Sequence, residues 1–93
     1  MANALVSVQI IPKGNHVIEL VDEAIAVIHD SGVKYEVHPL ETTMEGDLAE
    51  LLQVIEKMNH RMIELGSPNV ISQVKILFQP EGITLGTLTE KYR

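Results

Sequence analysis

The sequence contains no cysteine and no tryptophan, and its aromatic residues are limited to two tyrosines and one phenylalanine. The absence of cysteine excludes disulfides, thiolate metal sites and cysteine nucleophiles, and it is compatible with a reducing compartment. Hydrophobic residues still make up 45% of the chain, which excludes disorder by composition. Because rings are few, the core must consist mainly of Val, Ile and Leu, which favours helices and strands packed in two layers.

Basic residues are also scarce. Seven Lys and Arg side chains stand against 13 Asp and Glu, which gives a formal net charge of −6. This balance argues against a nucleic-acid partner, because phosphate neutralisation needs a cluster of basic side chains and these seven are scattered along the chain. A cationic or neutral small molecule fits the charge better.

Long apolar runs and a basic leader are missing as well. No apolar stretch approaches the ~20 residues of a membrane span. The N-terminus, Met-Ala-Asn-Ala, lacks the positive region of a secretory signal. We therefore expect a cytoplasmic protein with no membrane association. A length of 93 residues fits one domain spanning 1–93.

Two hydrophobic periods divide the chain into elements: alternation predicts strands, and spacings of three and four residues predict helices. The expected elements are a strand at 4–11, a helix at 16–30, strands at 34–41 and 42–45, a helix at 48–65, a strand at 70–78, and a tail at 80–93 with a short helix. Asp47 and Glu50 form the pattern of a helix start, with Asp47 as the N-cap. Pro39, which cannot donate to a ladder, indicates an edge strand or a bulge.

The order β-α-β-β-α-β predicts the α+β ferredoxin-like plait, a four-stranded antiparallel sheet with two helices on one face. In the strand order 4-1-3-2, the first strand is central. Val70, Val74, Ile76 and Phe78 are expected to face the helices. The uncovered face is expected to carry Leu5, Ser7, Gln9, Ile11, Glu36, His38, Glu45, Gln73 and Lys75. Apolar residues among these polar ones indicate a partner subunit, a ligand, or both.

Signals for catalysis and for metals are weak. The four histidines stand far apart, and none has a second ligand-type residue at metal-binding spacing, so we expect no metal site and no cofactor. Ser7 has no base near it in the sequence. Glu36, Glu41 and Glu45 surround one hairpin, where paired carboxylates can do acid–base work, although three acids on a hairpin are more often solvated. We expect no enzymatic activity.

The segment 35–46 contains a motif that is specific enough to indicate a protein family. Residues 35–46 read YEVHPLETTMEG, and this run resembles the hairpin of the small thiamine-binding protein family. The segment 6–12 is similar to the opening strand of that family, and 70–76 is similar to its last strand. The resemblance extends over roughly residues 4–76.

The resemblance implies a ferredoxin-like fold, sheet-mediated homo-oligomers (often tetramers), and non-catalytic binding of thiamine or a related pyrimidine as carrier or sensor. Carried over by position, the implied ligand contacts are Ser7, Gln9, Glu36, Thr42 and Glu45. A carboxylate such as Glu45 or Glu36 would balance the thiazolium cation of thiamine, and Gln9 or Thr42 would pair with its aminopyrimidine.

Two other interpretations stay open. The first is a structural or interaction module whose sheet-mediated homo-oligomer holds no small ligand. The second is an enzyme that uses the hairpin carboxylates.

Overall fold

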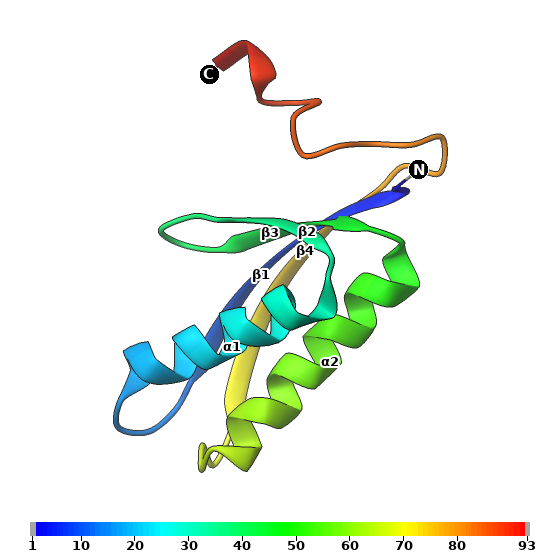
Figure 1. Cartoon of the computed structure of the whole chain (residues 1–93). Coiled ribbons are helices and arrows are strands. Elements are labelled where there is room, and N and C mark those ends of the chain that lie inside the picture. The colour runs from blue at the N-terminus through cyan, green and yellow to red at the C-terminus, as the bar shows by residue number, and fades with distance from the viewer. Residues whose placement is uncertain (1, 93) are drawn as a thin grey trace.

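The computed structural model describes residues 2–92. Its elements in chain order are β1 (Ala4–Pro12), α1 (Val17–Ser31), β2 (Lys34–Val37), β3 (Thr42–Gly46), α2 (Leu48–Glu64), β4 (Val70–Phe78) and one turn of 3-10 helix (Glu90–Tyr92). Figure 1 shows their arrangement. Both helices begin and end within one residue of the bounds that the hydrophobic period predicts.

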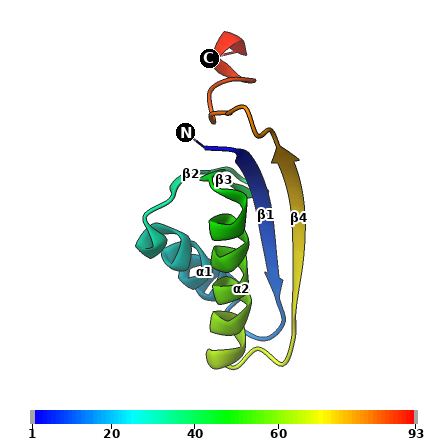
Figure 2. The ribbon, with the colours of Figure 1, turned by 90° about the vertical axis from the view of Figure 1, so that its right-hand side faces the viewer.

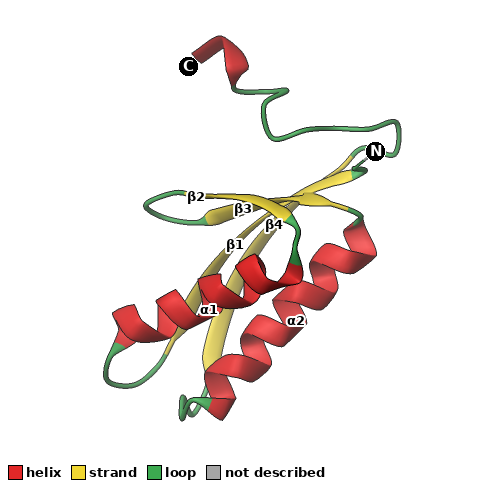
Figure 3. Ribbon diagram, in the orientation of Figure 1, coloured by secondary structure: helices red, strands yellow, loops and turns green. Residues whose placement is uncertain are grey.

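The strands form one antiparallel sheet in the order β2-β3-β1-β4, so the predicted ferredoxin-like fold with a central first strand is confirmed. Both helices lie on one face of the sheet, and the C-terminal segment lies on the opposite side (Figure 3). Figure 2 shows α2 running along β1 and β4. The face that the helices leave free is called the open face below.

The core lies between the sheet and the two helices. On β1 every second residue is buried and points to the helices: Ala4, Val6, Val8 and Ile10. Helix α1 adds Ala24 and Ile28, and α2 adds Leu51, Val54, Ile55, Met58 and Met62. Burying each large aliphatic side chain contributes about 1.5–3 kcal/mol, so this layer holds the helices on the sheet.

The second strand is shorter than expected. It ends at Val37, and residues 38–41 form a turn closed by the N–H of His38, which donates to the carbonyl of Glu41 at 2.8 Å. Pro39 lies in this turn, where its missing N–H costs nothing. The position of β2 at the sheet edge agrees with what Pro39 indicates.

The start of α2 is capped from outside the helix. Asp47 is the N-cap residue, as predicted, but its side chain makes no capping hydrogen bond. Asn3 does so instead: its Oδ1 accepts the backbone N–H of Leu48 at 2.9 Å, and its Nδ2 donates to Asp47 Oδ1 at 3.2 Å. The expected side-chain cap from Asp47 is therefore wrong. Pairing of Ala4 with Gly46 places Asn3 beside the helix start.

Replacing Asn3 with Ala should lower the free energy of unfolding by about 1 kcal/mol, because the N–H of Leu48 loses its acceptor. Asp47→Ala removes a charge and the acceptor of the exposed Asn3 Nδ2 but leaves the acceptor of the Leu48 N–H in place, so its effect should be smaller. Urea denaturation of both variants measures the two losses. An equal or larger loss in Asp47→Ala would contradict the assignment of the cap to Asn3.

The last strand is less covered than expected. Val70 and Val74 pack against the core, but Ile76 and Phe78 are 49% and 52% exposed. Register places both residues on the helix-facing side, opposite Val6 and Ala4. They remain exposed because β4 is an edge strand and no helix extends over this end of it.

The C-terminal segment folds back onto the sheet. The N–H of Gln79 donates to the carbonyl of Asn3, and the N–H of Ile83 donates to that of Ala2. The side chains of Ile83 and Leu85 are buried. The short helix expected within 80–93 is the single 3-10 turn at Glu90–Tyr92.

Candidate ligand-binding groove

The open face carries the residues that alternation predicts, except His38, which lies in the 38–41 turn because β2 ends at Val37. Cross-strand pairs on this face are Leu5 with Glu45 and Leu77, Ser7 with Thr43 and Lys75, Gln9 with Gln73, Ile11 with Ile71, and Glu36 with Thr43. Between β1 and β4, two polar pairs therefore lie in the middle and an apolar pair lies at each end. Along β1 and β4, this pattern provides polar groups at the centre of the face and apolar groups at both ends.

A groove of about 260 Å³ lies over this polar centre. It is lined by Ser7, Gln9, Leu40, Glu41, Gln73 and Lys75 and is called the open-face groove. Strands β1 and β4 provide its floor, and the turn between β2 and β3 provides one wall.

The central polar contact of the groove joins Ser7 to Glu41. Ser7 Oγ donates to Glu41 Oε2 at 2.9 Å, and both side chains are partly buried. A hydrogen bond to a carboxylate is stronger than one between neutral groups, so this contact fixes the position of Glu41. The second carboxylate oxygen of Glu41 makes no hydrogen bond within residues 2–92 and can accept one from a ligand.

The groove also contains two amides and one ammonium. Gln9 and Gln73 are register partners, and each amide offers both a donor and an acceptor. Lys75 pairs in register with Ser7 from the side opposite to Glu41. The groove can thus form hydrogen bonds with a planar heterocycle and interact with groups of either charge.

A second cavity of about 180 Å³ lies on the other side of the 38–41 turn, beneath the helices. Its lining is mostly apolar, with contributions from β1, α1, the turn and Met58. Gln9, Leu40 and Glu41 line both hollows. The second cavity is called the hairpin cavity below. The 38–41 turn separates it from the open-face groove.

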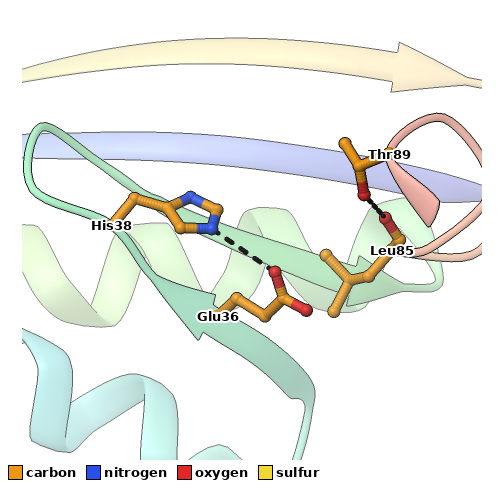
Figure 4. Close-up of polar contacts among 4 residues, drawn as sticks. All are labelled: Glu36, His38, Leu85 and Thr89. Atoms are coloured by element: carbon orange, nitrogen blue, oxygen red, sulfur yellow. Dashed lines mark hydrogen bonds and ion pairs between the residues drawn. The ribbon is translucent and has the colours of Figure 1, made fainter. Parts of the chain in front are cut away.

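The structure brings together only some of the implied ligand contacts. Ser7 and Gln9 line the open-face groove. Glu36 is on the same face but outside the groove, and its Oε2 lies 3.3 Å from His38 Nε2 (Figure 4). Thr42 is buried on the helix side and lines the hairpin cavity.

Glu45 lies farther along the open face, under the C-terminal segment. Its Oε1 accepts the backbone N–H of Leu85 at 2.7 Å. Thr89 Oγ1 donates to the carbonyl of Leu85, which closes the turn that follows (Figure 4). Glu45 thus anchors this segment to the sheet.

The groove includes residues that the implied contacts omit, namely Leu40, Glu41, Gln73 and Lys75. Alternation places Gln73 and Lys75 on the open face, and Glu41 belongs to the carboxylates of the hairpin. No local pattern links Ser7 to Glu41, because they are 34 residues apart and meet only through the 38–41 turn. Within residues 2–92, no three His, Asp or Glu side chains gather as a metal site would require.

Comparison with known proteins identifies the family. A family model described as thiamine-binding protein matches residues 6–93. The chain belongs to the thiamine-binding protein family. A UPF0045 protein of Clostridium perfringens is 43% identical over 90 residues, and the match covers 95% of each chain. The family resemblance seen in the 35–46 run is confirmed.

Solved structures that resemble this chain have the same fold. A domain of unknown function from Bacillus cereus superposes with a TM-score of 0.92 at 36% identity, covering 100% of this chain and 93% of its own. A protein of Thermotoga maritima whose name links it to thiamine biosynthesis or salvage gives a TM-score of 0.89 at 29% identity, covering 98% and 99%. Among the described residues of this family member, no helix is long and apolar enough to cross a membrane.

Proposed function

We propose that this protein binds thiamine or a related aminopyrimidine in the open-face groove, as a carrier or sensor without a catalytic step. Membership of the thiamine-binding family supports a ligand of this class. The observation that carries the proposal is the Glu41 carboxylate, which Ser7 holds at 2.9 Å in a groove that also contains two amides.

The groove chemistry matches the two halves of thiamine. The thiazolium ring is a permanent cation, and the Glu41 carboxylate can balance it. The aminopyrimidine presents a donor beside ring acceptors, and the amides of Gln9 and Gln73 can pair with both kinds of group. Leu40 adds an apolar wall, as is usual in small-molecule sites.

The other implied contacts remain predictions from the family resemblance. Glu36 lies on the open face opposite Thr43, and contact with it requires a ligand that extends beyond the groove. Thr42 faces the hairpin cavity and Glu45 holds Leu85. For these two residues, ligand contact would require the 38–41 turn or the C-terminal segment to move.

Calorimetric titration with thiamine, and with hydroxymethylpyrimidine in parallel, tests the proposal. We expect saturable binding of thiamine, and weaker binding of hydroxymethylpyrimidine because it lacks the cation that Glu41 balances. Flat titrations with both compounds would contradict a binding function and would favour an assembly module.

We also propose a homo-oligomer formed through the sheet. Strand β4 is an edge strand, and its Ile71 and Leu77 are exposed on the open face. A second copy over this face would cover the apolar pairs and enclose the groove. Light scattering tests this assembly: a mass equal to that of one 10.3 kDa chain would contradict it.

A further inference from the structure

The open-face groove contains charges of opposite sign on its two sides. Glu41 approaches Ser7 from the turn between β2 and β3, and Lys75 approaches it from β4. Directly opposed residues of antiparallel strands have Cβ atoms about 4.5–5.5 Å apart. One short side chain of β1 therefore lies between a carboxylate and an ammonium that line the same groove.

The Lys75 ammonium and the Glu41 carboxylate do not form an ion pair with each other. Within residues 2–92, no hydrogen bond and no ion pair within 4.0 Å involves the Lys75 ammonium. The Glu41 carboxylate accepts only from Ser7 within the same residues. An ion pair forming between them in solution would be exposed and worth little, so a ligand that contacts both could replace it at small cost.

We propose that Lys75 is a specificity-determining residue and that the groove prefers a ligand with a phosphate group attached to the cation. This inference rests on the proposed function, because Glu41 must first hold the cationic ring. Lysine binds phosphate oxygens through its charge and three N–H donors. Lys75 is positioned to do so on the side of Ser7 opposite to the ring.

The charge of the whole chain explains why both groups are required. With a formal net charge of −6, the protein repels free anions. Lys75 alone therefore should not capture inorganic phosphate. When the phosphate is attached to a cation, the whole ligand carries less negative charge than free phosphate. It can then interact with Glu41 through the cation and with Lys75 through the phosphate.

The test compares thiamine with its phosphate monoester by calorimetric titration of the wild type, Lys75→Met and Lys34→Met. Lys34 is the matched control. It is an exposed lysine on the same open face, but it lies on β2, at the sheet edge opposite to β4, and is paired in register with Glu45. We expect the wild type to bind the phosphate ester about tenfold more tightly than thiamine, as one charge-assisted contact permits. Lys75→Met should lose this preference, and Lys34→Met should keep it.

Thiamine itself should bind Lys75→Met slightly more tightly than it binds the wild type, because a positive charge near the cation has been removed. Inorganic phosphate should give no heat with any of the three proteins. Equal affinity for the two ligands in the wild type, an unchanged preference in Lys75→Met, or a preference lost in Lys34→Met would overturn the role of Lys75 while thiamine binding stands. Absence of binding by both ligands would overturn the proposed function as well.

Discussion

Glu41→Gln is expected to raise the dissociation constant for thiamine by about tenfold to a hundredfold. The thiazolium ring has no N–H to donate, so the interaction is an attraction between two charges; at about 4 Å it is worth about 1 kcal/mol in water and about 4 kcal/mol near a protein surface, and about 1.4 kcal/mol corresponds to a factor of ten in affinity. Gln keeps an oxygen that can accept the hydrogen bond of Ser7, so the substitution removes the negative charge and preserves the groove. Calorimetric titration measures the affinity, and the unfolding temperature should change little.

Glu45→Gln is the matched control on the same face of the sheet. Its carboxylate accepts the N–H of Leu85, so the substitution should loosen the C-terminal segment and leave thiamine affinity close to that of the wild type. Amide hydrogen exchange at Leu85 reports on the segment independently of the ligand. Binding lost in Glu45→Gln but kept in Glu41→Gln would move the site away from the groove, to the position that the family resemblance implies.

The largest expected effect on stability comes from Ile28→Ala in α1. Ile28 is fully buried in the core, and removing its outer carbons leaves a cavity between helix and sheet. Such truncations cost about 2–5 kcal/mol. Because domains of this kind have a total stability of about 5–15 kcal/mol, the variant should unfold at a much lower urea concentration.

The same substitution at Ile18 supplies the control, because Ile18 lies on α1 and is 76% exposed. Ile18→Ala should change the free energy of unfolding by about 0.5 kcal/mol or less. Equal losses at positions 18 and 28 would contradict the described packing of α1. A large loss at position 18 alone would indicate that its exposed side is covered in an assembly.

Thiamine binding and stability are also linked. A ligand that binds only the folded state stabilises it in proportion to the logarithm of its concentration over the dissociation constant. The thermal shift produced by thiamine should therefore be reduced in Glu41→Gln and retained in Glu45→Gln, which checks the titrations by an independent measurement.

Most of the fold could be predicted from local patterns. Alternation along 4–11 distinguishes the buried side of β1 from its open side, and the 3–4 spacing of apolar residues sets both helices to within one residue. These predictions succeed because the type of each element and its buried face depend on the spacing of apolar residues, and that spacing can be seen within a few neighbouring positions. The hairpin run at 35–46 was also sufficient to indicate the family.

Contacts between residues far apart in the sequence could not be predicted from local patterns. Asn3, not Asp47, caps α2, and Glu45 meets the N–H of Leu85 in a segment with no clear period. Ile76 and Phe78 have the spacing of core residues but lie on an edge strand beyond the cover of the helices. In each case exposure or bonding depends on which elements lie nearby, and sequence spacing does not determine this.

The sequence by itself determined the element order, the open face, the shortage of positive charge and the relationship to the thiamine-binding family. Only the tertiary structure decided which of those open-face residues form a groove. The 38–41 turn brings Glu41 back to Ser7, and antiparallel register places Lys75 on the other side of the same serine. The physical reason is that a binding site requires several side chains at fixed distances, and those distances depend on turn geometry and strand register, whereas local sequence sets only which face each side chain occupies.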